Sequence, residues 1–186
     1  LSLHDALPIF EMRADDRVLQ FASLNFDVSL EQIFTTLWSG ARLVVRGTEV
    51  WSAEEFFERS AEYGLTVANL PTAYWQQLTQ TLDPIALGRN TQLRLVIVGG
   101  DSIMPEAVAQ WQSAQIDPGA IRLLNAYGPT ETTIIASIYD IPAGFGETSS
   151  PVRVPIGRPT PNKSIYVLDE QLEPVPVGVP GQLYIG

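Results

Sequence analysis

Residues 121–132 read IRLLNAYGPTET, an apolar run followed at once by an aromatic ring, a Gly-Pro turn, a hydroxyl and a carboxylate. The apolar run is typical of a buried strand, and Gly128-Pro129 turns the backbone sharply. Open α/β sheets bind their ligands in the loops that follow the carboxyl ends of parallel strands. The stretch therefore predicts a parallel strand with a ligand site in the loop after Tyr127.

Strand and helix patterns alternate on both sides of this stretch, from about residue 17 to residue 140. We expect strands at 18–21, 41–45, 65–70, 93–98 and 121–127, and helices from about 29, at 52–63, 72–81 and 105–113. Alternating strands and amphipathic helices predict an α/β fold, with a mostly parallel sheet flanked by helices.

Two of the expected helices have clear start signals. Asp27 or Ser29 can cap the first, whose apolar positions Leu30, Ile33, Phe34 and Leu37 follow the spacing of one buried face. Residues 52–55 (SAEE) form a capping box for the second, which Gly64 ends.

The composition changes after residue 141, where Pro and Gly become frequent. Residues 164–169 and 181–186 are expected to be strands of a small β-rich segment, part of a barrel. We therefore divide the chain into an α/β core at 10–141 and a β-rich segment at 142–186. Residues 1–9 resemble a translated sequencing adapter and are expected to be non-native, and both ends look cut.

The net charge and the cysteine content of this 186-residue chain argue against several functions. The net charge of −10 argues against binding nucleic acid or anionic membranes as the main role. With no cysteine, neither a disulfide nor a zinc–thiolate site can form. No apolar run reaches the ~20 residues that span a membrane, and we expect a cytoplasmic protein.

Four polar segments lie at expected carboxyl ends of strands or in the turns that follow: 26–29, 69–71, 99–101 and 125–132. Each has an ordinary structural explanation, since Asp27 can be a helix cap and the others can be plain turns. Their convergence on the ligand-binding edge of one sheet favours a shared site.

The chain resembles the adenylation domains of nonribosomal peptide synthetases, within the superfamily that also includes acyl-CoA synthetases and luciferase. Residues 26–29 (FDVS), 125–131 (NAYGPTE) and 181–186 (GQLYIG) match three family motifs in order and spacing. Residues 15–23 and 156–159 also read as family sequence. The resemblance covers about residues 10–186 and implies a truncated N-terminal subdomain.

The resemblance implies that ATP and an amino acid give an aminoacyl-adenylate, whose acyl group then passes to a carrier-protein thiol. Tyr127 would stack on adenine, Thr130 would contact the α-phosphate, and Glu131 would hold Mg²⁺, so Thr130 and Glu131 are the expected catalytic residues. The wider nucleotide-binding set is Gly99, Gly100, Asp101, Asn125, Ala126, Tyr127, Gly128 and Thr130.

For the substrate, the resemblance implies that Asp27 binds the α-amino group. The other pocket positions are Val28, Glu31, Asn69, Ile97, Gly99, Ala126, Ile134 and Ile135. Glu31 falls one helical turn after Asp27, so both carboxylates can share a face. A second acid in the pocket suggests ornithine, N-hydroxyornithine or another basic amino acid, whereas a Glu31 that faced solvent would remove this argument.

Departures from the family pattern limit what the chain can do alone. The Gly/Ser/Thr-rich phosphate loop and the C-terminal subdomain with its catalytic lysine are missing, and Lys163 lacks that motif's surroundings. We therefore expect the fragment to be inactive. The implied partners are the carrier (thiolation) domain, with its phosphopantetheine, and the condensation domain of a parent synthetase.

Two other functions stay open. An acyl- or aryl-acid:CoA ligase of the same superfamily would share the nucleotide site, although a carboxylate at Asp27 would be costly beside an alkyl chain. A non-catalytic nucleotide-binding module would keep the pocket but lack the flanking motifs.

Overall fold

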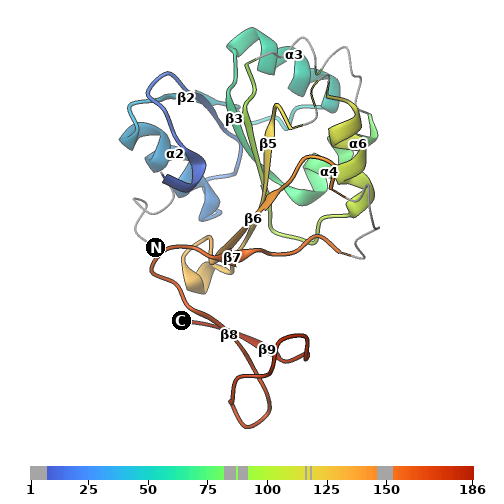
Figure 1. Ribbon diagram of the computed structural model, residues 1–186. Helices are drawn as coiled ribbons and strands as arrows, with labels where there is room; N and C mark the ends of the chain where they lie inside the picture. Colours follow the sequence, from blue (N-terminus) through green and yellow to red (C-terminus); the bar gives the residue numbers. More distant parts are fainter. Residues whose placement is uncertain (1–7, 82–86, 88–91, 116, 118, 146–152) are drawn as a thin grey trace.

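A computed structural model describes residues 8–81, 87, 92–115, 117, 119–145 and 153–186 of the chain (Figure 1). Residues 1–7, with most of the expected adapter-like leader and His4, lie outside this description. The elements, in chain order, are β1 (Arg17–Gln20), α2 (Val28–Trp38), β2 (Arg42–Val45), α3 (Ala53–Tyr63), β3 (Val67–Pro71), α4 (Thr72–Gln80), β4 (Leu95–Gly99), α6 (Pro105–Ser113), β5 (Arg122–Tyr127), the 3₁₀ helix η1 (Thr130–Thr132), β6 (Ser137–Ile141), β7 (Arg158–Pro159), β8 (Ile165–Leu168) and β9 (Gln182–Ile185).

Seven strands form the main sheet in the order β2-β1-β3-β4-β5-β6-β7. The first five pair in parallel, and β6 and β7 join antiparallel. The predicted α/β class with a mostly parallel sheet is confirmed. Strand β6 was not predicted, because residues 137–141 follow an irregular loop and reverse direction without a helix.

Helices α3, α4 and α6 cover one face of the sheet and bury the larger core (Figure 1). Phe56 of α3, Trp75 of α4 and Trp111 of α6 are fully buried. The rings of Trp75 and Trp111 lie 5.9 Å apart in a tilted contact. Alternate strand residues point to opposite faces, so Ala68 belongs to this core while Val67 belongs to a smaller core on the other face.

Helix α3 begins and ends as its sequence predicts. The Ser52 hydroxyl accepts a bond from Glu55 N, and the Glu55 carboxylate accepts one from Ser52 N, which completes the capping box. Gly64 ends the helix in the left-handed conformation, with φ 60°. Phe56 and Phe57 are buried against the sheet, whereas Glu54 and Glu58 are exposed.

Helix α2 lies on the other side of the sheet and contradicts its predicted orientation (Figure 1). The expected buried face is exposed: Leu30 and Phe34 are each 48% exposed and Leu37 is 58% exposed. The buried residues are Ser29, Glu31, Gln32, Thr35 and Thr36. The helical spacing identified the apolar positions of α2 correctly, but we expected these positions to face the sheet. The polar residues of α2 face the sheet instead.

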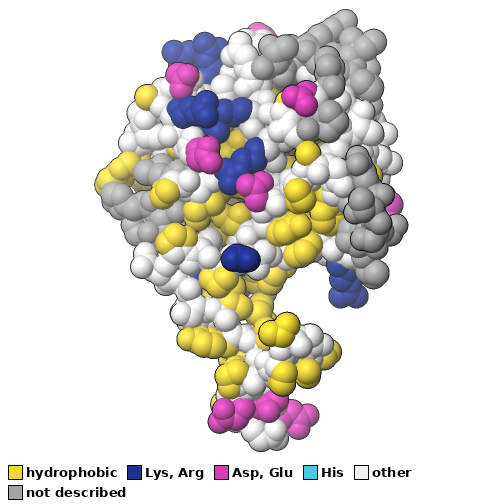
Figure 2. Space-filling view, in the orientation of Figure 1, with side chains coloured by type: hydrophobic (Ala, Val, Ile, Leu, Met, Phe, Trp, Pro, Cys, Tyr) yellow, Lys and Arg dark blue, Asp and Glu magenta, His cyan; other side chains and the backbone are white. Residues whose placement is uncertain are grey.

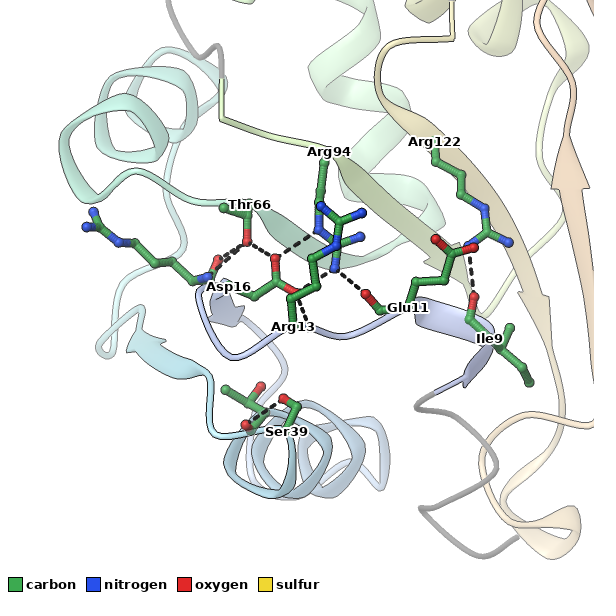
Figure 3. A network of polar contacts seen from close by, with 10 residues as sticks. Ile9, Glu11, Arg13, Asp16, Ser39, Thr66, Arg94 and Arg122 are labelled. Atoms are coloured by element: carbon green, nitrogen blue, oxygen red, sulfur yellow. Dashed lines mark hydrogen bonds and ion pairs between the residues drawn. The ribbon is translucent and has the colours of Figure 1, made fainter.

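The end of the sheet opposite the strand carboxyl ends is held by an ion-pair network around Asp16 (Figure 3). Its carboxylate accepts hydrogen bonds from the Arg94 guanidinium and from the Thr66 hydroxyl. Burial raises the pKa of Asp16, but the bonds from Arg94, Thr66 and Arg13 N outweigh it and hold the pKa below its ordinary value. The network joins the starts of β1, β3 and β4.

The last two strands form a separate antiparallel hairpin, β8–β9, that projects from the main body (Figure 1). Both strands lie within the ranges predicted from the sequence, 164–169 and 181–186. Hydrophobic side chains gather over this segment (Figure 2). Strand β7 lies after residue 142 but pairs with β6 in the main sheet. The division of the chain at residue 142 stays a prediction. Within the described residues, no helix has the length and apolarity needed to cross a membrane.

Candidate nucleotide and amino-acid site

The carboxyl ends of β3, β4 and β5 are level with one another, because Pro71 pairs with Gly99 and Gly99 with Ala126. This register brings together three of the four segments that the sequence singled out. The fourth, residues 26–29, reaches the same edge through the loop that joins β1 to α2. The predicted convergence of polar segments at one sheet edge is therefore present.

A cavity of about 470 Å³ lies between this edge and α2. It is lined by most of the residues expected to meet the substrate, namely Asp27, Val28, Glu31, Asn69, Gly99, Ala126, Ile134 and Ile135. The exception is Ile97, which is 2% exposed and packs in the smaller core under the cavity floor.

Asp27 occupies the N-cap position of α2 but does not cap it, since its side chain makes no capping hydrogen bond. The first turn is held by backbone bonds instead, from Ser29 N to Phe26 O and from Leu30 N to Asp27 O. A residue type that favours capping is thus present without performing that function. Asp27 is one of the residues that line the cavity.

Glu31 is the most unusual side chain of the cavity. It is 1% exposed, which rules out a solvent-facing orientation. Its Oε1 accepts a 2.9 Å bond from the Asn69 amide, while its Oε2 is buried without a partner. Burial raises the pKa of Glu31 to about 8, the nearby Asp27 charge adds to the rise, and the Asn69 bond opposes it.

Gln32 is a residue of the site that sequence reasoning missed. Its Oε1 accepts bonds from Phe21 N and Ala22 N, both 3.0 Å, and its Nε2 donates to Asn69 O at 2.9 Å. It therefore joins α2 to the ends of β1 and β3. The signal was present in the sequence, because Glu31, Gln32, Thr35 and Thr36 share one helical face; the missed lining residues are Phe21, Ala22, Ser23, Phe26, Gln32 and Arg46.

A second cavity, of about 450 Å³, adjoins the first and shares Gly100, Ala126 and Gly128 with it. The predicted nucleotide residues that line it are Gly100, Asp101, Asn125, Ala126, Tyr127 and Gly128. Tyr127 lines this cavity and is 37% exposed as a residue, so a planar group can reach it. The buried Asn125 amide donates a 2.8 Å bond to Pro155 O, fixing the segment that supplies Val154 and Ile156 to this cavity.

Gly99 and Gly128 are required by close backbone contacts around the two cavities. A Cβ on Gly99 would lie 2.7 Å from Ala126 O, and one on Gly128 would lie 2.5 Å from Ile134 O. Any larger residue would push β5 away from β4 or open the loop after Tyr127. The two glycines therefore allow the close approach of β4 to β5, and of the loop after Tyr127 to the backbone of residues 134–136, beside the cavities.

The loop that closes the site contains two strained residues. Thr133 and Ile134 have φ values of 62° and 66°, which β-branched residues rarely adopt. Such strain costs about 1–3 kcal/mol a residue and clusters at functional sites. This backbone conformation places Ile134 in the lining of the larger cavity.

Thr130 and Glu131 lie on η1, are exposed, and line neither cavity. Among the described residues, no three His, Cys, Asp or Glu side chains are grouped to hold a metal ion by themselves. A single carboxylate is nevertheless a usual protein ligand for Mg²⁺ when phosphate oxygens supply others. The Lys163 ammonium donates to Thr132 O and so anchors this loop to the segment before β8.

Comparison with known proteins gives the family. A match to the family described as "AMP-binding enzyme" covers residues 2–186. The chain belongs to the AMP-binding enzyme family. Curated relatives include isonitrile lipopeptide synthase of Streptomyces coeruleorubidus, 39% identical over 84% of this chain, and tyrocidine synthase 1 of Brevibacillus parabrevis, 35% identical over 95%. The chain spans 10% and 15% of the lengths of these two proteins.

Solved structures of AMP-binding enzymes share the fold. The N-terminal subdomain of Klebsiella oxytoca NpsA, in complex with 3-hydroxybenzoyl-AMSN, has a TM-score of 0.80 and 25% identity, covering 96% of this chain and 43% of that one. The AMPPNP-bound form of the nonribosomal peptide synthetase FmoA3 has a TM-score of 0.85 and 25% identity, covering 98% of this chain and 19% of that one. The predicted resemblance to the N-terminal subdomain of a peptide synthetase adenylation domain is confirmed.

Proposed function

We propose that this chain is the part of an amino-acid-activating enzyme that binds the amino acid and the adenosine of ATP. The observation that carries the proposal is Asp27, a carboxylate that stands at a helix start without capping it and lines a cavity. A carboxylate in a partly enclosed site needs a cation to compensate its desolvation. The α-ammonium group of an amino acid supplies that cation.

The side chain of the substrate carries a second amine in this proposal. Glu31 Oε2 is buried without a partner in the same cavity as Asp27, and two nearby carboxylates disfavour each other's ionisation. A substrate with two ammonium groups would meet both acids and allow Glu31 to ionise. Ornithine fits this chemistry, N-hydroxyornithine replaces the second ammonium by a hydrogen-bond donor, and other basic amino acids follow.

The second cavity would take the nucleotide, with adenine against Tyr127. This assignment is supported by the adjoining walls of the cavities and by FmoA3, a relative of this fold whose structure holds AMPPNP. Thr130 would contact the α-phosphate and Glu131 would bind Mg²⁺, which supplies charge neutralisation when present. The residues fit that role, because both are exposed and directly follow Pro129, which lines that cavity.

The chain's residues would act by orienting the reactants. Asp27 would hold the ammonium end of the amino acid so that the substrate's carboxylate faces the boundary of the two cavities at Gly100, Ala126 and Gly128, where the α-phosphorus would lie. A carboxylate oxygen then bonds to phosphorus as the bond to pyrophosphate breaks, giving the aminoacyl-adenylate. Positioning of two bound groups accounts for much of the rate in such reactions. Transfer to a carrier-domain thiol, in a cytoplasmic synthetase with a condensation domain, would follow.

The test is ATP–pyrophosphate exchange with an adenylation domain completed from the gene's flanking sequence, supplied with a panel of amino acids. We expect ornithine or lysine to exceed leucine and phenylalanine, and Glu31→Gln to reduce that preference by about 10–100-fold. Glu58→Gln on the exposed face of α3 is the matched control. Preference of the parent domain for leucine or phenylalanine would refute the basic substrate while leaving amino-acid activation in place.

The 186-residue chain by itself is expected to show almost no exchange, because the phosphate loop and the catalytic lysine implied by the family lie outside it. Exchange by this chain at the rate of the completed domain would overturn that expectation.

A second candidate is activation of an aryl acid, as in an acyl- or aryl-acid:CoA ligase. It is favoured by one observation, the 3-hydroxybenzoyl compound in the NpsA structure. An aryl acid has no cation for Asp27 or Glu31, so we rank this candidate second. Activity with hydroxybenzoate and CoA, and none with amino acids and a carrier domain, would reverse the order.

A further inference from the structure

The turn that follows β4 lies at the boundary of the two cavities. We call residues 99–101 the β4 turn. Gly99 lines the larger cavity, Asp101 lines the second, and Gly100 lines both. Gly100 has a φ of 94°, a conformation that residues with side chains rarely adopt. The position of the β4 turn therefore affects the shape of both cavities.

One buried side chain outside the cavities bonds to the β4 turn. Thr72, the first residue of α4, is 2% exposed and lines neither cavity. Its hydroxyl lies 3.1 Å from Gly99 O and 3.1 Å from Asp101 O and donates its single proton to this pair of carbonyl oxygens. Because the two carbonyls belong to the residues on either side of Gly100, the Thr72 hydroxyl holds both ends of the turn.

Strand pairing explains why Thr72 can reach the turn. Strand β3 ends at Pro71, which pairs with Gly99, so the next residue of the chain begins α4 beside the end of β4. The backbone of β5 limits the turn from the other side, since a Cβ on Gly99 would lie only 2.7 Å from Ala126 O. The β4 turn is therefore held between α4 and β5.

Loss of the Thr72 hydroxyl would leave two carbonyl groups of the turn without this partner. Unpaired polar groups at a part-buried site are costly, so the backbone would shift to find other partners. The shift would occur where Gly100 borders both cavities.

We propose that Thr72 is a positioning residue for adenylate formation, which holds the β4 turn so that the amino acid and the α-phosphate of ATP meet at the boundary of the two cavities. This inference rests on the proposed function and adds to it a residue that touches neither reactant. A displacement of about 1 Å between two reacting groups can slow a reaction by about 100-fold. Each reactant would keep its other contacts, so binding should change less than the rate.

The test compares two buried threonines of α4 in the adenylation domain completed from the gene's flanking sequence. Thr72→Val keeps the branched shape and removes the hydroxyl, and Thr72→Ser keeps the hydroxyl. Thr79→Val is the matched control, because Thr79 is 4% exposed and its hydroxyl donates to Gln76 O within the same helix. Circular dichroism gives the folded fraction of each variant at the assay temperature.

We expect Thr72→Val to lower the kcat of ATP–pyrophosphate exchange per folded molecule by about 10–100-fold, with the KM values for ATP and the amino acid changed less than about threefold. Thr79→Val should stay within about twofold of the parent domain, and Thr72→Ser within about fivefold. If Thr72→Val fails to fold, Thr72→Ala replaces it.

Three results would overturn the inference. Equal kcat values for Thr72→Val and Thr79→Val per folded molecule would do so and leave the proposed function in place. An equal loss in Thr72→Ser and Thr72→Val would assign the effect to the methyl group rather than to the hydroxyl. A parent domain that exchanges with no amino acid would overturn the proposed function and this inference with it.

Discussion

Helices α2 and α3 have the same length, eleven residues, and opposite designs. Helix α3 buries Phe56 and Phe57 and exposes its charged residues Glu54 and Glu58. Helix α2 buries polar residues and exposes Leu30, Phe34, Leu37 and Trp38. Helix α3 packs its apolar side on the larger core, whereas α2 supplies a cavity wall and has its apolar side exposed.

The difference teaches that the buried face of a helix is set by what lies beneath it. The α3 side of the sheet is an apolar core, so apolar side chains turn inward. Beneath α2 lie the ends of β1 and β3, with backbone groups that need hydrogen bonds. Four predictions follow the comparison, from the largest expected effect to the smallest.

The strongest test compares one phenylalanine on each helix. Phe56→Ala should lower the free energy of unfolding of this chain by about 3–5 kcal/mol, because it leaves a cavity in the core. Phe34→Ala should change it by less than about 0.5 kcal/mol, since the ring is half exposed and contributes little in this chain. Urea unfolding followed by circular dichroism measures both, and equal losses would contradict the comparison.

The second prediction concerns pH. The folded-state pKa of Glu31, about 8, lies above its ordinary value of 4.5, so the unfolded chain releases this proton first as pH rises. The contribution of Glu31 to stability therefore falls between about pH 4.5 and 8 and is constant above. The difference in free energy of unfolding between Glu31→Gln and the parent chain should therefore shift in favour of the variant by about 1–4 kcal/mol from pH 4.5 to pH 8. Thermal midpoints of the two proteins across this range, with Glu58→Gln as control, check it; parallel curves for all three would refute it.

The third prediction tests the polar contacts of α2. Gln32→Leu keeps the approximate volume but removes the bonds to Phe21 N, Ala22 N and Asn69 O. We expect a loss of about 2 kcal/mol, because these groups lose their partner at a mostly enclosed site. Gln110→Leu on the exposed face of α6 is the control. A stability gain from Gln32→Leu would show that α2 tolerates an apolar inner face.

The smallest effect compares the two helix starts. Ser52→Ala should cost about 1 kcal/mol, because the capping box is lost. Asp27→Asn should lower the free energy of unfolding by only about a few tenths of a kcal/mol, since Asp27 makes no capping bond. Chemical denaturation midpoints distinguish the two, and a larger loss at Asp27 would assign its carboxylate to the helix rather than to a ligand.

Local signals predicted the fold well where one short segment determines the result. The capping box at Ser52, the left-handed Gly64 and Pro105 at the start of α6 are such cases. The convergence of Asp27, Asn69 and the Tyr127 loop also followed from the order of strands in an open sheet. These features depend on neighbours in sequence or on a general topological rule.

The features that sequence reasoning missed depend on partners far along the chain. The inward face of α2 is set by Phe21, Ala22 and Asn69, and the antiparallel β6 is set by its pairing with β5. The strained φ of Ile134 has no local signal either, because residue type argues against it. Ile97 was placed in the pocket by the family resemblance; it pairs with Asn69 on the cavity face of the sheet and packs in the smaller core with Ala126 and Ile135.

The contact between Lys163 and the η1 loop has a practical consequence. Lys163 is the single lysine of the sequence, so the chain has one ε-amine, and that amine lies against Thr132 O. A reagent that acylates amines at high pH would modify this position besides the amino terminus. The product would lose the ammonium that bonds to Thr132 O, so acylation of this one amine would detach the η1 loop from the segment before β8.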